Sequence, residues 1–190
     1  MKQIVLSAAL LTFAIGTALA QPPAGPPAPR PPSLTFTNPP FEDGGVIPDQ
    51  YTAKAVPQPA KSLPLSWTNV PAGTQSFALI MHDEDVAANR SMTDNLHWLI
   101  FNIPATATAL PAGVPNVATL SDGSIQPMNR TTNGYGGPGY PGPGYHHYAI
   151  ELFALDIKLP LGVTASREDV IKASEGHVLS KAVLAGRFHR

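Results

Sequence analysis

The chain has 190 residues, with 22 prolines, 16 glycines and no cysteine, and its 12 basic and 13 acidic residues nearly cancel. This length suffices for one domain with a sizeable core, and the lack of cysteine excludes disulfides, thiolate metal sites, thiol catalysis and a cysteine-linked lipoprotein anchor. The near-neutral charge argues against nucleic acid as a partner, because nucleic-acid-binding proteins usually carry a basic patch.

Residues 1–20 have the pattern of a secretory signal peptide. Lys2 precedes an apolar run from Ile4 to Ile15, and Ala18-Leu19-Ala20 supplies the small residues of a cleavage site. A transmembrane anchor is the alternative, but the apolar run is short for a bilayer, which takes about 20 residues. We therefore predict export with cleavage after Ala20, a periplasmic or secreted location, and no stable membrane anchor after cleavage.

The next segment, residues 21–32, is dominated by proline (QPPAGPPAPRPP). Such a run has few backbone donors and little apolar surface to bury, so it is expected to form an extended, polyproline-like tether. A ligand for SH3-type domains is the alternative interpretation, and export disfavours it. The folded domain is therefore predicted to span residues 33–190.

From Ser33 onward, short apolar runs alternate with proline, glycine and asparagine. The predicted strands, rich in aromatic and β-branched residues, are 76–82, 96–103 and 147–157, with shorter candidates at 34–37, 63–67 and 183–188. A helix is expected over 166–181, where Ser166 can cap the first turn and Asp169 lies three residues on. These elements predict a mostly β domain with one or two C-terminal helices.

Three long connections separate these elements, at 83–95, 104–131 and 133–145. Long loops inside a compact domain are more often functional than accidental. The last of them, NGYGGPGYPGPGY, leads directly into His146. A site is therefore expected where these loops meet the strand ends.

The strand that follows this loop begins with two histidines and a tyrosine. Alternation along a strand places His146 and Tyr148 on one face and His147 on the other. The adjacent histidines therefore cannot both bind one metal ion while the strand stays regular, and we predict no metal site and no cofactor.

Two other strands carry polar residues whose function is ambiguous when each is taken alone. A single histidine such as His97 is more often a core residue than a ligand, and Asp83 with Asp85 at a strand end is more often a solvated turn. If the strand ends converge, imidazole N–H groups and a phenol O–H can donate to an oxyanion, while carboxylates orient the histidines or receive an ammonium group. Such a cleft suits a zwitterion such as a phosphoethanolamine head group.

An ordered series of motifs extends over about residues 34–190. It comprises Phe41-Glu42-Asp43-Gly44-Gly45-Val46-Ile47-Pro48, Leu63-Pro64-Leu65-Ser66-Trp67, Asp83-Glu84-Asp85, His97-Trp98, Gly137-Pro138, His146-His147-Tyr148 and Gly176-His177. In this order the motifs resemble the phosphatidylethanolamine-binding proteins, in their bacterial Raf-kinase-inhibitor-like branch. The resemblance implies a large antiparallel sheet packed on a smaller sheet, with C-terminal helices near the mouth of an anion-binding pocket.

The resemblance also implies which residues build that pocket. They are the wall residues Asp83, Asp85, His97, His146 and Tyr148, with Gly137 and Pro138 at the rim. By the same resemblance, His97 and His146 donate to the anion and Asp83 orients a histidine. Glu84 and Tyr140 stand where the family usually has proline, and Glu84 is expected to add negative charge near the anion.

These observations predict an exported protein that binds phosphate, a phospholipid head group or a similar small anion or zwitterion, without catalysis. One alternative is an inhibitor or regulator of a periplasmic hydrolase, a protein partner that export favours over a kinase. A hydrolase using His97 and His146 as acid and base is less favoured. The chain has no Gly-x-Ser-x-Gly motif, and Ser91 and Ser124 lie in loops without an adjacent base signal.

Overall fold

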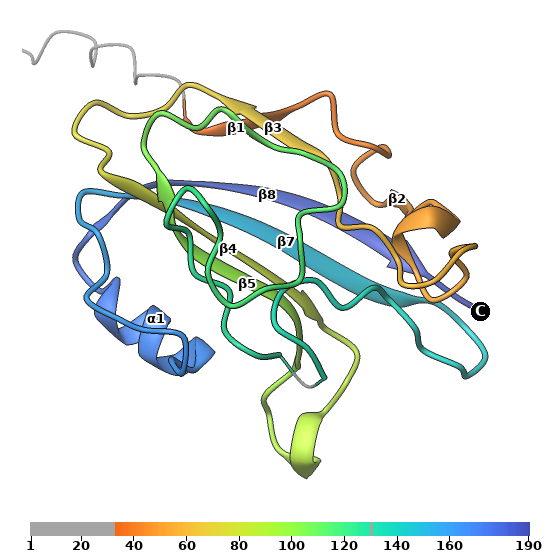
Figure 1. Ribbon diagram of the computed structural model, residues 1–190. Coiled ribbons are helices and arrows are strands. Elements are labelled where there is room, and N and C mark those ends of the chain that lie inside the picture. Colours follow the sequence, from red (N-terminus) through yellow and green to blue (C-terminus); the bar gives the residue numbers. More distant parts are fainter. Residues whose placement is uncertain (1–32, 130) are drawn as a thin grey trace, which may run out of the picture. The chain divides into compact units, whose positions relative to one another are not determined.

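The computed structural model describes residues 33–129 and 131–190, so the predicted signal peptide (1–20) and tether (21–32) lie outside the described residues. Among the described residues, a smaller and a larger sheet pack face to face (Figure 1). The smaller sheet has the strand order β1 (Thr35–Thr37), β3 (Leu65–Thr68) and β6 (Ala109–Leu110). The predicted mostly β fold with a larger and a smaller sheet is therefore confirmed.

The larger sheet carries the long strands. Its order is β2 (Gly45–Val46), β8 (Val178–Phe188), β7 (His146–Leu155), β4 (Ser76–Asp83) and β5 (Asn95–Pro104). All neighbours are antiparallel except β2, which pairs parallel with β8. The larger sheet is thus antiparallel apart from the two-residue strand at one edge.

Strand β4 is buried along its whole length because the sheet is covered on both faces. Leu79 and Met81 face the smaller sheet, in one core cluster with Trp67. Ala78 and Ile80 face the opposite side, in a second cluster with Val170 of the helix α1 (Arg167–Ala173). Each fully buried large apolar side chain contributes about 1.5–3 kcal/mol, so both faces of β4 stabilise the fold.

The helix is shorter than the predicted 166–181. Its start is as expected: Ser166 Oγ accepts from the Asp169 N–H at 3.0 Å, and Asp169 Oδ2 accepts from the Ser166 N–H at 2.9 Å. Gly176 then takes a positive φ of 79° and the chain enters β8 at Val178, so the helix prediction is wrong beyond Ala173. One α-helix therefore stands in the described residues where one or two were expected, and none there is long and apolar enough to cross a membrane.

The predicted strands are present with shifted ends. The segments 76–82, 96–103 and 147–157 correspond to β4, β5 and β7, and 34–37, 63–67 and 183–188 correspond to β1, β3 and β8. Strand β8 begins five residues earlier than expected (178 against 183), and the two-residue strands β2 and β6 were not predicted. A two-residue strand shows no alternation, so only its partner strand defines it.

Candidate functional site

At one end of the larger sheet, three strand ends lie side by side and bring polar residues together. Strand β4 ends at Asp83, β5 begins at Asn95 and β7 begins at His146. Asp83 pairs with Asn95 on one side and with Tyr148 on the other. Because neighbouring strands are antiparallel, the end of one lies beside the start of the next, so the predicted convergence of these strand ends is present.

Asp83 and His146 form a buried pair at this end of the sheet. Their exposed fractions are 2% and 8%, and His146 Nδ1 lies 2.8 Å from Asp83 Oδ2 and 3.0 Å from Oδ1. A carboxylate can only accept, so Nδ1 carries the proton. Asp83 therefore orients the His146 ring through Nδ1 and leaves Nε2 free of this contact.

His97 is oriented by two partners inside the chain. Its Nδ1 lies 2.6 Å from the Gly136 carbonyl oxygen, and Asn95 Nδ2 lies 3.1 Å from its Nε2. The carbonyl only accepts, so Nδ1 donates to Gly136 and Nε2 accepts from the Asn95 amide. Both ring nitrogens thus contact groups of the chain itself, and His97 lines the cavity as an oriented wall residue; its role as an anion donor stays a prediction.

Tyr148 places a buried hydroxyl group next to the Asp83 carboxylate. The residue is 1% exposed, and its hydroxyl has no hydrogen-bond partner among the described residues. Burial, and then the negative charge of Asp83, raise the pKa of this phenol, so it stays protonated at neutral pH. A buried donor without an ordinary hydrogen bond costs about 1–3 kcal/mol, so a ligand oxygen that accepts from this hydroxyl would be stabilised. The Tyr148 ring also packs edge-to-face on His97, with 5.2 Å between centroids.

An open cavity of about 330 Å³ lies beside these residues. It is lined by Asp83, Val86, Asn95, Leu96, His97, Asn129, Thr131, Gly136, Gly137, Gly139, Tyr140 and Pro141. Three of the seven predicted site residues thus line the cavity, whereas Asp85, Pro138, His146 and Tyr148 do not. A larger cavity of about 740 Å³ shares Val86, Asn95, Leu96 and Asn129 with it but is lined by none of the seven.

Tyr140, which the sequence analysis did not assign to the site, explains why His146 does not line the cavity. The two rings are stacked, with centroids 3.4 Å apart and planes 22° from parallel. Tyr140 therefore covers one face of the imidazole. A face-to-face stack leaves the edge of the ring, where Nε2 lies, as the route to a ligand.

Asp85 and Glu84 do not take the places expected of them. Asp85 Oδ2 accepts from the backbone N–H of His147 at 2.6 Å and contacts the His147 Nδ1 at 3.0 Å, so it fastens the turn to β7. Slight burial acts to raise the pKa of Asp85, but the hydrogen bonds from His147 outweigh it and lower the pKa. Glu84 Oε1 lies 3.5 Å from Nδ1 of His82, so its charge turns towards that residue and not into the cavity.

Two groups of described residues have the spacing of metal ligands. They are Asp83, Asp85 and His146, and His82, Glu84 and Asp94. In the first group the ligand atoms already bond within the chain, since Asp83 accepts from His146 and Asp85 accepts from His147. We assign no metal to this site.

The rim glycine Gly137 is required by close packing. A Cβ atom at Gly137 would lie 2.9 Å from the Tyr51 carbonyl oxygen and 2.9 Å from Ala60 Cβ. The neighbouring Pro138 carbonyl accepts from the Ala53 N–H at 2.7 Å, so the rim is held against the segment after Tyr51. The glycine therefore allows the rim loop to approach this backbone.

Gly137→Ala is expected to lower the free energy of unfolding by about 1–3 kcal/mol, because the added methyl group cannot be accommodated without moving backbone. Urea denaturation followed by circular dichroism measures this change. Gly162→Ala is the matched control, since a Cβ there meets nothing within 4 Å. Equal stability of the two variants would contradict the close approach at the rim.

The comparisons with known proteins agree with this arrangement. Residues 37–189 match a family model described as phosphatidylethanolamine-binding protein. The chain is 46% identical over 151 residues to a UPF0098 protein of Methanothermobacter thermautotrophicus, covering 79% of this chain and 95% of the relative. It is also similar to the crystal structure of CT736 from Chlamydia trachomatis, with a TM-score of 0.72, 27% identity, and coverage of 83% and 98% of the two chains. For YbcL of Escherichia coli the TM-score is 0.69, the identity 26%, and the coverage 84% and 99%.

Proposed function

Because the chain belongs to the phosphatidylethanolamine-binding protein family, we propose that the 330 Å³ cavity binds a small anion or zwitterion, with phosphate or a phosphorylated head group as the ligand. The fold is that of a ligand-binding family, and the cavity volume falls within the range of small-molecule sites, about 300–1,000 Å³. The protein holds this ligand and does not convert it.

The observation that carries the proposal is the buried Tyr148 hydroxyl beside Asp83: within the described residues it makes no hydrogen bond of ordinary geometry, so it can turn to a ligand oxygen. It lies across the strand pair from Asp83, whose carboxylate orients His146. The phenol O–H and the oriented His146 ring are thereby held beside the cavity at the same strand ends. A phosphate oxygen accepts strongly from such groups.

The cationic end of a zwitterion has a partner at the same place. Asp83 lines the cavity and is 2% exposed, so its carboxylate can receive an ammonium group in a site with little competing water. Asn129 and Thr131 add neutral polar groups to the lining. This combination supports phosphoethanolamine as a better ligand than phosphate alone.

The described residues give no support to a serine hydrolase. Ser91 Oγ bonds to the Ala88 carbonyl and to Thr93 Oγ1, and the Ser124 hydroxyl is buried without a partner in the stretches of chain that the structure describes. Neither serine contacts a histidine there. The signal-peptide pattern supports a proposed place of action outside the cytoplasm, where lipid head groups and free phosphate are both available.

Calorimetric titration with phosphate and with phosphoethanolamine tests the proposal. We expect His146→Ala to weaken binding by about tenfold to a hundredfold, the effect of losing a charge-assisted hydrogen bond. His147→Ala is the matched control, because this adjacent histidine is exposed and points away from the cavity side of β7. Equally weak heats for the wild type and His146→Ala would exclude the cavity as the binding site.

A further inference from the structure

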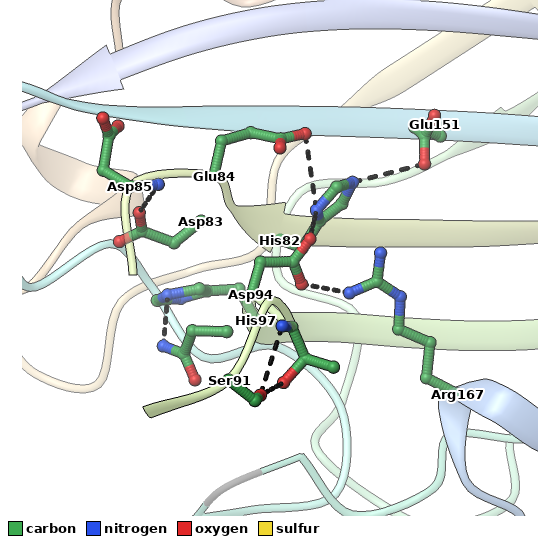
Figure 2. Close-up of polar contacts among 11 residues, drawn as sticks. His82, Asp83, Glu84, Asp85, Ser91, Asp94, His97, Glu151 and Arg167 are labelled. Carbon is green, nitrogen blue, oxygen red and sulfur yellow. Dashed lines mark hydrogen bonds and ion pairs between the residues drawn. The ribbon is translucent and has the colours of Figure 1, made fainter. Parts of the chain in front are cut away.

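A second polar cluster lies at the same strand ends, on the opposite face of the larger sheet (Figure 2). Its centre is His82, which is 5% exposed. His82 Nδ1 lies 2.5 Å from Asp94 Oδ2 and 3.5 Å from Glu84 Oε1, and its Nε2 lies 3.3 Å from Glu151 Oε2. Carboxylates face both ring nitrogens, and because carboxylates only accept, this geometry favours a ring that carries both protons.

The charges packed around His82 balance when the ring is protonated. The negative groups are Glu84 at the end of β4, Asp94 before β5 and Glu151 of β7. The positive groups are Arg167 of α1, which is paired with Asp94, and Lys181 of β8, whose Nζ lies 2.5 Å from Glu151 Oε1. Three carboxylates thus face two permanent cations, and the imidazolium is the third.

The direction of titration agrees with this geometry. Burial and the positive charge of Arg167 act to lower the pKa of His82, but the hydrogen bond to Glu151, together with the charge and hydrogen bond of Asp94, outweighs them, so the pKa lies above its usual value of 6.5. The hydrogen bonds from His82 and Lys181, working against burial, lower the pKa of Glu151 to about 2. A raised folded-state pKa means that the stabilisation is complete below about pH 6.5 and is lost as the pH rises through the folded value.

The two clusters share their backbone. His82 precedes Asp83 on β4, and Asp94 precedes Asn95 at the start of β5, where Asp83 pairs with Asn95. Successive residues point to opposite faces, so each pair sends one side chain to the cavity and one to the outer cluster. Figure 2 shows Asp83 and Asp85 on one side of the strand end and His82, Glu151 and Arg167 on the other.

We propose that His82 is a positioning residue for the cavity: its imidazolium joins the ends of β4 and β5 from the outer face, and loss of its proton loosens Asp83 and Asn95. Asp83 orients His146, and Asn95 orients His97. The protonation of His82 therefore controls the orientation of His146 and His97 without contacting either. This role concerns the cavity of the proposed function, but it exists in the protein without a ligand.

Hydrogen exchange and histidine NMR of the unliganded protein, measured from pH 5.5 to 9, test the role. The reporters are two amides on the cavity side, Glu84 N–H bonded to the His147 carbonyl and Gly136 N–H bonded to the His97 carbonyl. As His82 deprotonates, their protection, corrected for intrinsic exchange, should fall about tenfold for each unit by which the pKa of His82 exceeds its ordinary value.

Two variants separate this role from a general loss of stability. Glu151→Gln should lower the titration midpoint of His82 by about one pH unit, and the pH at which the protection of both amides falls should decrease by the same amount. His177→Gln is the matched control, because His177 forms an exposed pair with Asp156, at 2.8 Å, on a different region of the domain. It should leave both midpoints in place.

The result that would overturn the role is a wild-type protein in which His82 titrates while the Gly136 amide shows no change at that midpoint, an outcome that needs no variant to fold. A shifted His82 midpoint in Glu151→Gln with unshifted amides would also overturn it. Because no ligand is present, failure of the phosphate titration leaves this result intact, and the two proposals fail separately.

Discussion

Gln126→Leu should lower the free energy of unfolding by about 2–4 kcal/mol, although leucine nearly preserves the volume of the side chain. Gln126 is fully buried. Its Oε1 accepts from Trp98 Nε1 at 2.8 Å, and its Nε2 donates to the carbonyls of Pro115 and Val117 at 2.8 and 3.0 Å. Leucine removes all three bonds and leaves the buried indole N–H without an acceptor.

The measurement is urea denaturation monitored by tryptophan fluorescence, with the slope against urea expected to stay constant because the buried surface changes little. Gln58→Leu is the matched control. Gln58 Nε2 also donates to two carbonyls, those of Ala53 and Ala55, each at 2.9 Å, but this side chain is exposed. The control should lose less than about 1 kcal/mol, because water replaces the lost bonds. An equal decrease in the free energy of unfolding of the two variants would contradict the prediction that burial makes the hydrogen bonds of Gln126 important.

Asp83→Asn should weaken phosphoethanolamine binding by about tenfold to a hundredfold and phosphate binding by less. Asparagine keeps the shape of the side chain but replaces the carboxylate that orients His146 through Nδ1 with an uncharged amide, so the ring is held less firmly. It also removes the carboxylate that receives the ammonium group. Phosphate loses the firmly oriented histidine but escapes the repulsion of Asp83, which makes its net loss smaller.

Titrations of both ligands at one pH and one ionic strength measure this difference, with thermal denaturation as the check on folding. Asp85→Asn is the matched control, since Asp85 bonds to His147 and does not line the cavity. Its affinities should stay close to those of the wild type. If Asp83→Asn weakened phosphate more than phosphoethanolamine, the assignment of Asp83 to the ammonium end would be wrong.

The candidate site could be predicted in composition but not in contacts. Alternation along a strand is a local property, so His146 and Tyr148 could be placed on one face from the sequence. The pairing of His146 with Asp83 joins residues 63 positions apart, and it depends on the register of β4 and β7. No local pattern defines that register, because it follows from packing both faces of β4.

The residues that the sequence analysis missed are those whose role depends on neighbours from other elements. Asn95 orients His97 from two residues earlier on β5, Gly136 orients it from the loop before β7, and Tyr140 stacks on His146. The glycine- and proline-rich loop before His146 signalled that the rim is shaped by its backbone, but not which side chain would turn inward. His82 lies in an apolar strand, and nothing local distinguishes it from a core histidine.

The sequence by itself determined the family, the mostly β class and the strand ends where the polar residues gather, because motif order and strand periodicity are properties of the linear chain. The composition likewise determined that the domain has no disulfide or thiolate site, since it contains no cysteine. The end of the helix and the early start of β8 were decided by the tertiary structure, where pairing of Val178–Phe188 with β7 outweighs local helix propensity. Only that structure also set the contact of His97 with Gly136, the covering of His146 by Tyr140 and the charge balance around His82, because each depends on groups that folding brings together from distant segments of the chain.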